Sequence, residues 1–164
     1  MPGSKSVVPG EILHEIFEKI SKGDITDDKI ADMAKRLFIS GEMNEADAEN
    51  GIAEINKTVE LLKEKCIWQG IILPVKDSFT ELPFVFESGN SVYRGRIDRV
   101  IKDGDVYNIY DYKTFPVADD EIGEIVKEHS FQLDIYKKAV KKIFNTNSVK
   151  SFIVFTHIGE VREV

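Results

Sequence analysis

The chain contains a single cysteine, Cys66, in 164 residues. An internal disulfide is therefore excluded, and so are a zinc site or an iron–sulfur cluster built from four cysteines. A cytoplasmic location is the simplest expectation, because that compartment keeps thiols reduced. No apolar run approaches the roughly 20 residues that cross a bilayer, so no membrane partner is expected. Residues 1–9 lack the apolar core of a signal peptide and are interpreted as a tail.

An excess of positive charge is also absent, since the formal net charge is -7 at pH 7. Residues 91–150 carry 11 Lys and Arg against 10 Asp and Glu, whereas the rest of the chain carries 11 against 19. This balance disfavours strong electrostatic binding of nucleic acid by the chain alone. The same balance is compatible with a domain tethered to a larger DNA-binding protein, because tethering raises the effective concentration of DNA near the domain.

Apolar residues at helical spacing dominate the first half of the chain. They predict helices over residues 10–22, from an N-cap at Thr26 to Phe38, and from about Asn44 to Trp68. The third helix is expected to carry Cys66 on its apolar stripe. Pro74 is expected to close this region, and residues 24–72 contain no motif with a readable role.

Alternating residues and turn signals mark short strands in the second half. Strands are predicted over residues 79–86, 92–101, 106–113, 151–156 and 160–164. Between them, residues 116–128 are interpreted as an acidic connector, either without regular structure or with a short helix, and residues 130–144 as a helix. This order favours an α/β fold with a mixed central sheet flanked by helices. We expect one domain over residues 10–164, with a helical part at 10–75 and an α/β core at 76–164 that the helix 10–22 completes.

Two acids and a lysine fall on one face of the predicted hairpin. Asp103-Gly104 is a strong two-residue turn signal, which pairs Lys102 with Asp105. In this register Asp98 faces Ile109 and Asp111 faces Arg96. The two acids are then diagonal neighbours on one sheet face, and Lys113 shares that face. A slip of one residue would separate them.

Two converging carboxylates repel each other unless a cation lies between them. Their oxygen ligands favour Mg²⁺ or Mn²⁺, which would hold a phosphate oxygen and lower the pKa of a bound water. Lys113 would orient that water or neutralise charge on the phosphate. The alternative is a surface hairpin with ordinary cross-strand pairs, because the D-x-K pattern is common.

The segments Gly95-Arg96-Ile97-Asp98 and Asp111-Tyr112-Lys113 resemble the core of the PD-(D/E)xK nuclease superfamily. More narrowly, they resemble the nuclease domain of RecB/AddA-type helicase-nucleases. The resemblance implies a restriction-endonuclease-like core in which Asp98, Asp111 and the backbone carbonyl of Tyr112 bind the metal. It also implies that Lys113 is catalytic.

Three further segments match the family. Gly10–Glu18 is similar to its opening G-x-x-x-H helix, which implies that His14 is a metal ligand. Gln132–Tyr136 is similar to its Q-x-x-x-Y motif, which implies that Gln132 and Tyr136 support the site and the DNA strand. Glu81-Leu82-Pro83-Phe84 is similar to its E-x-P-F strand, which puts Glu81 near the site. Considered alone, His14, Tyr136 and Glu81 are as readily structural.

Several charged residues near these motifs have two interpretations. Arg96 either holds DNA phosphate or pairs across the hairpin with Asp111. The lysines late in the last long helix either contact phosphates or complement the helix C-terminus; they are Lys137, Lys138, Lys141 and Lys142. His129 and His157 have no recognisable partner in the sequence.

The resemblance implies a Mg²⁺- or Mn²⁺-dependent exonuclease that hydrolyses single-stranded DNA in double-strand-break repair and recombination. The single cysteine excludes the branches that carry an iron–sulfur cluster. No G-x-x-x-x-G-K-[ST] loop is present, which excludes an ATPase of that type in this chain. We expect a fragment of a helicase-nuclease, with a small stand-alone nuclease as the alternative. Its partners would be DNA, the helicase part of the same chain and a second helicase-nuclease subunit. The alternative is a catalytically silent module that binds DNA or docks proteins in a recombination complex.

Overall fold

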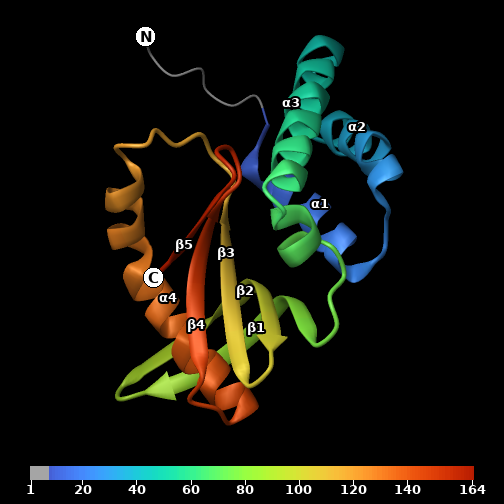
Figure 1. Ribbon diagram of the computed structural model, residues 1–164. Helices are drawn as coiled ribbons and strands as arrows, with labels where there is room; N and C mark the ends of the chain where they lie inside the picture. Colours follow the sequence, from blue (N-terminus) through green and yellow to red (C-terminus); the bar gives the residue numbers. More distant parts are fainter. Residues whose placement is uncertain (1–7) are drawn as a thin grey trace. The chain divides into compact units, whose positions relative to one another are not determined.

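The computed structural model describes residues 8–164 and contains two compact units (Figure 1). One unit runs to Pro74 and includes Lys113–Pro116 and Phe155–Glu160. The other comprises Val75–Tyr112, Val117–Val154 and Val161–Val164. Residues 1–7 of the predicted tail lie outside the described residues. The expectation of one nuclease domain over residues 10–164 remains a prediction.

The first unit is built around three helices: α1 (Gly10–Lys22), α2 (Ile30–Ser40) and α3 (Glu45–Glu64). Their apolar stripes meet in a core that fully buries Phe17, Phe38 and Leu62. Trp68, in a π-helical turn (Trp68–Ile72), packs edge-on against Phe17 with ring centroids 6.2 Å apart. The predicted helix 10–22 is confirmed at both ends.

The second and third helices differ from prediction at their ends. Thr26 precedes a 3-10 turn (Asp27–Lys29), and its hydroxyl bonds to the Asp28 side chain instead of capping a backbone N–H. The third helix ends at Glu64, because Cys66 has a φ of 59°, which a right-handed helix does not accommodate. Cys66 is exposed, so its predicted place on the apolar stripe is wrong.

The second unit contains most of a five-stranded sheet. In chain order, which is also the order in the sheet, its strands are β1 (Ser78–Ser88), β2 (Ser91–Asp103), β3 (Val106–Lys113), β4 (Val149–Phe155) and β5 (Glu160–Glu163). β1, β2 and β3 pair antiparallel. β4 runs parallel to β3, because the Tyr107 N–H donates to the Ser148 carbonyl at 2.9 Å and, further along, Tyr110 stacks on Phe152. The sheet is mixed, which confirms the predicted α/β class.

The turn between β2 and β3 differs from prediction. Asp103 pairs with Val106, so the central residues of the turn are Gly104 and Asp105. Gly104 has a φ of 58°, and a glycine with positive φ at the first central position is typical of a type II′ turn. Lys102 therefore faces Tyr107 and not Asp105. Each residue of β2 therefore pairs with a β3 residue two positions further along than predicted. Because side chains alternate with a period of two, every side chain keeps its predicted face.

The helix α4 (Ile122–Phe144) lies along the sheet (Figure 1). Its Phe144 contacts Phe79 and Tyr107, with ring centroids 4.9 and 4.4 Å apart. The helix begins at Ile122 and not at residue 130, so much of the predicted acidic connector is helical. Glu124 in its first turn is favourable at the positive end of the helix dipole. Within residues 8–164, every helix is too short or too polar to span a lipid bilayer.

Candidate active site

Three carboxylates form a row across the first three strands. The β1–β2 pairing on either side of Glu81 places it opposite Asp98. The β2–β3 pairing includes Arg99 with Tyr110, and one step further it places Asp98 opposite Asp111. Residues directly opposite each other on antiparallel strands point to the same face. The three acids are therefore expected on one face of the sheet, and a carboxylate oxygen of Glu81 lies within 4.8 Å of one from Asp98.

This row corrects the predicted register but preserves its consequence. Asp98 was expected to face Ile109 and Asp111 to face Arg96. In the structure Ile109 faces Val100 and Tyr110 faces Arg99, so the pairing is displaced by two residues from the predicted one. The two acids are thus direct neighbours and not diagonal ones, which brings them closer together.

Glu81 has a strained backbone. Its φ of 51° lies in the left-handed region, which costs a non-glycine residue about 1–2 kcal/mol. Strain of this kind persists where surrounding structure enforces it, and it concentrates at functional sites. Pro83 follows two residues later and is tolerated because β1 is an edge strand. The E-x-P-F segment thus presents the Glu81 carboxylate to the row.

Asp98 is fixed by a backbone contact from the D-x-K segment. One of its carboxylate oxygens accepts a 2.8 Å hydrogen bond from the Tyr112 N–H. Such a bond holds the carboxylate in one orientation. Asp111 beside it is buried, with 5% of its surface exposed. A buried carboxylate needs a positive charge or hydrogen bonds to compensate the cost of its burial.

The Q-x-x-x-Y motif lies on α4 in the surroundings of the same acids. The Gln132 Nε2 donates to the Tyr136 hydroxyl at 2.8 Å. Burial raises the pKa of Tyr136, and the negative charges of Asp111, Asp98 and Glu81 raise it further. Tyr136 therefore stays protonated and supplies a neutral hydroxyl near the carboxylates.

Sequence reasoning missed a third member of this chain of contacts. The Nδ1 of His129 lies 3.4 Å from the Oε1 of Gln132. The three residues are spaced i, i+3 and i+7 on α4, and such spacing places side chains on one helix face. This spacing was the available signal, but three polar residues on a helix are too common to stand out.

Lys113, the last residue of β3, is anchored through its backbone. Its carbonyl accepts bonds from both the N–H and the hydroxyl of Thr156, at 3.1 and 3.2 Å. The next carbonyl, that of Thr114, lies 3.0 Å from the His157 Nε2. His157, which had no recognisable partner in the sequence, thus helps to hold this segment. By strand alternation, the Lys113 side chain shares the face of Asp111.

The opening glycine of the G-x-x-x-H pattern contacts the segment that follows Lys113. A Cβ atom on Gly10 would lie 2.7 Å from the Thr114 hydroxyl oxygen, so a larger residue forces a shift there. His14 follows one helical turn later, roughly 6 Å along α1. His14 and the carboxylate row belong to different compact units, and its role as a metal ligand remains a prediction.

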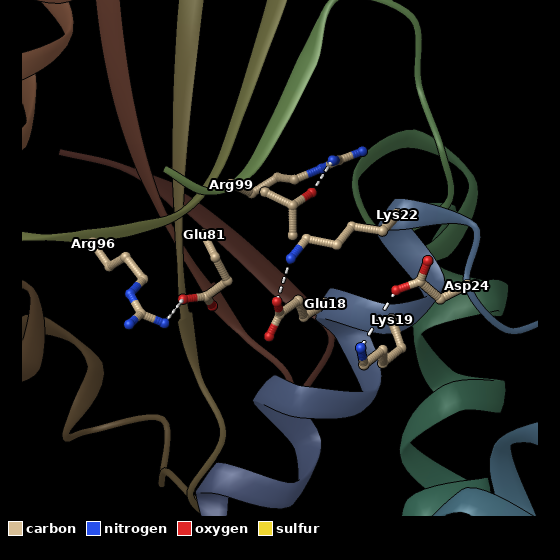
Figure 2. Close-up of polar contacts among 8 residues, drawn as sticks. Glu18, Lys19, Lys22, Asp24, Glu81, Arg96 and Arg99 are labelled. Carbon is tan, nitrogen blue, oxygen red and sulfur yellow. Dashed lines mark hydrogen bonds and ion pairs between the residues drawn. The ribbon is translucent and has the colours of Figure 1, made fainter. Parts of the chain in front are cut away.

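The arginines beside Asp98 have different partners (Figure 2). Arg96 forms an ion pair with Glu81, with Nη1 and Oε2 3.7 Å apart, so its predicted pairing with Asp111 is wrong. Its side chain is 67% exposed, and such pairs contribute about 0–1 kcal/mol. Arg99 is buried and donates to the Thr80 hydroxyl at 2.6 Å. Burial lowers the pKa of Arg99.

The donor set of the row suits a hard divalent cation. All three side chains offer carboxylate oxygens, which Mg²⁺ and Mn²⁺ prefer. Octahedral Mg²⁺ holds oxygens at about 2.1 Å, so two opposite ligands stand roughly 4 Å apart. The oxygens of Glu81 and Asp98, which lie within 4.8 Å of each other, are compatible with this separation.

The fold and the acid–acid–lysine set define the class of protein, and the family comparison agrees. Residues 2–163 match the PD-(D/E)XK nuclease superfamily, and the chain belongs to it.

Within the superfamily, the chain is similar to two bacterial proteins whose names describe them as subunits of an ATP-dependent helicase/nuclease. The relative from Clostridium acetobutylicum is 19% identical over 170 residues, and the one from Exiguobacterium sibiricum is 24% identical over 177 residues. Each alignment covers 94% of this chain and 14% of the relative. The chain thus spans a small part of the length of these proteins.

Proposed function

We propose that this chain is a divalent-metal-dependent deoxyribonuclease that removes nucleotides from single-stranded DNA by hydrolysing phosphodiester bonds. The observation that carries the proposal is the row of Glu81, Asp98 and Asp111, with Lys113 two residues beyond Asp111 on the same strand. Membership of the nuclease superfamily supports the same reaction class.

Each residue of the site has a proposed role. Asp98, Asp111 and the Tyr112 carbonyl hold Mg²⁺ or Mn²⁺, with His14 and Glu81 as further ligands. A bound cation polarises a phosphate oxygen and lowers the pKa of a bound water. Lys113 orients the attacking water and offsets negative charge on the phosphate.

The groups around the ligands position the substrate. Gln132 and the neutral Tyr136 hydroxyl hydrogen-bond near the scissile phosphate, since their bond to each other already places both polar groups together. Arg96 is largely exposed and is paired only weakly with Glu81, so its guanidinium can turn to a DNA phosphate.

The relatives suggest the larger context. Both are helicase/nuclease subunits, so we propose that helicase motifs in a longer chain deliver the strand, together with a second subunit. Tethering also offsets the weak attraction of DNA to a chain with a net charge of -7, because it raises the effective concentration of DNA at the site. The proposed setting is double-strand-break repair in the cytoplasm.

The proposal is tested by incubating end-labelled single-stranded DNA with the chain and Mn²⁺. We expect cleavage that a chelator abolishes. Asp111→Asn and Lys113→Gln should each lower the rate by about 10²-fold or more, the range of a lost catalytic group. Asp105→Asn and Lys102→Gln make the same chemical changes in the same hairpin and should cleave normally. Equal rates in all four variants would contradict the assignment.

A catalytically silent DNA-binding or docking module is the second candidate, favoured by the acidic net charge. Mn²⁺ calorimetry separates the two. Metal binding that weakens in Asp98→Asn and Asp111→Asn supports the nuclease, whereas the absence of such binding supports the silent module.

A further inference from the structure

One exposed face of α4 combines lysines with an aromatic ring. Phe131 is 66% exposed, although a phenylalanine usually buries most of its surface. Lys138, Lys141 and Lys142 are also exposed, and they follow it by seven, ten and eleven residues. At 3.6 residues per turn, all four fall on one stripe of the helix. We call these four residues the basic face of α4.

Acidic residues do not cancel the charge of this face. Asp134 lies on the same stripe, but its Oδ1 is 3.0 Å from the Lys137 Nζ, so it is already compensated. Glu124 and Glu128 lie in the first part of the helix, before Phe131. The second half of α4 is therefore locally positive in a chain whose net charge is -7.

A polar hollow continues the basic face past the end of the helix. It has a volume of about 380 Å³ and is lined by Lys141, Lys142, Asn145, Thr146 and Asn147. The helix C-terminus contributes about half a negative charge, which two lysines outweigh. Ammonium, amide and hydroxyl groups together are suited to phosphate oxygens.

The basic face lies on the same helix as Gln132 and Tyr136, roughly 100° or more around the helix axis from them. Phe131 precedes Gln132 in the sequence, and Tyr136 on the same helix lies in the field of Asp111, Asp98 and Glu81. From Phe131 to Lys141 the helix rises roughly 15 Å. That length corresponds to about four phosphates of a stacked strand.

Resting on the proposed nuclease function, we propose that the basic face of α4 is the binding track for single-stranded DNA. A base stacks on Phe131, the phosphates that follow contact Lys138 and Lys141, and the hollow takes a further phosphate. Lysines combined with exposed aromatic rings are typical of surfaces that bind single strands without sequence preference. A duplex would not use Phe131, because its bases are already stacked.

The charge part of the proposal is tested by fluorescence anisotropy with a labelled 12-nucleotide strand, in the presence of EDTA so that no cleavage occurs. Each phosphate contact contributes about 0.7 to the slope of log affinity against log salt for single strands. Lys138→Gln/Lys141→Gln should reduce that slope by about 1.4. Lys57→Gln/Lys76→Gln removes two exposed lysines elsewhere and should leave the slope unchanged.

The stacking part is tested with Phe131→Ala, which should weaken binding about 5-fold or more. Phe131→Trp should keep the affinity, because it keeps an aromatic face. Ile39→Ala, at a position that is 60% exposed on α2, is the matched control and should bind like the wild type.

These measurements separate the track from the nuclease function. Asp111→Asn should bind the strand normally, since its loss affects cleavage and not the track. An unchanged salt slope in Lys138→Gln/Lys141→Gln, or no measurable binding by the wild type at low salt, would overturn the track. If these variants bind DNA normally but lose affinity for a helicase fragment, the face is a protein-docking surface and the proposal is wrong.

Discussion

Glu81 combines a strained backbone with a carboxylate in the row. Its φ of 51° is unfavourable for a residue with a Cβ, and its oxygen lies within 4.8 Å of an Asp98 oxygen, so like charges meet there. Both effects lower stability in the absence of a cation. A functional residue that works against stability is the usual pattern at an active site.

Glu81→Gly should therefore stabilise the chain while it weakens metal binding. Glycine removes the left-handed strain of about 1–2 kcal/mol but adds about 0.5–1 kcal/mol of chain entropy, so the net gain is about 1 kcal/mol or less. The loss of a ligand should lower Mn²⁺ affinity by at least about 10-fold, as even indirect support of a ligand is worth that much. Urea unfolding and calorimetry measure the two effects.

Asp77→Gly is the matched control, because Asp77 has a φ of 55° and lies outside the row. It should raise stability in the same way and leave Mn²⁺ affinity unchanged. If both variants change metal affinity equally, Glu81 does not contribute a ligand.

The sequence predicts that Asp98, Asp111 and Lys113 share one face of the sheet, because strand alternation survives an error of two residues in the register. It does not predict that Glu81 lies directly opposite Asp98. That placement depends on pairing between β1 and β2 and on a backbone conformation that glutamate seldom adopts. Nor does it predict the contact of Gly10 with Thr114, which lie 104 residues apart in the chain.

At the scale of elements, helix existence was predictable and helix ends were not. Apolar periodicity gives α1, α2, α3 and α4, since one stripe of each must be buried. The ends depend on single residues: the positive φ of Cys66 stops α3, and Ile122, 8% exposed, begins α4 inside a stretch rich in acids. Apolar periodicity extended the third helix too far, and composition left open whether the acidic stretch before residue 130 is helical.

The packing of α2 against α3 depends on a glycine. A Cβ atom at Gly51 would lie 2.5 Å from the ring of Phe38, which is fully buried. We expect Gly51→Ala to destabilise the chain by about 1–3 kcal/mol from overpacking, less up to about 1 kcal/mol of gained helix propensity. Chemical denaturation measures the change.

Two further variants isolate the cause. Gly51→Ala/Phe38→Leu should recover part of the lost stability, because the smaller side chain makes room. Gly123→Ala in α4 gains propensity with no atom within 4 Å of the new methyl group, so it should be neutral or stabilising. If Gly51→Ala behaves like Gly123→Ala, the contact with Phe38 does not limit this position.

At the scale of the whole molecule, the proposed activity has to be reconciled with an acidic net charge. The chain covers 14% of its helicase/nuclease relatives, and its net charge of -7 leaves the basic face of α4 as a local exception. Delivery of DNA by a tethered helicase and guidance along α4 are thus complementary proposals. The first supplies concentration and the second supplies direction toward the carboxylate row.

The stability of the whole molecule should fall at alkaline pH because of two buried tyrosines. Burial raises the pKa of Tyr112, opposed by the Arg99 charge, and burial with the nearby acids raises the pKa of Tyr136. Below pH 10, the ordinary pKa of tyrosine, both hydroxyls stay protonated in the folded and in the unfolded chain, so their titration does not change the free energy of unfolding. Above pH 10 the unfolded chain ionises first, so stability falls by about 1.4 kcal/mol per pH unit for each tyrosine until the folded state also ionises.

Urea unfolding between pH 9 and 11.5 measures this slope. Tyr112→Phe and Tyr136→Phe should each remove about 1.4 kcal/mol per pH unit from this slope. Tyr110, whose pKa burial also raises, should leave a residual slope in the double variant. A double variant with the wild-type slope would show that other groups cause the alkaline loss.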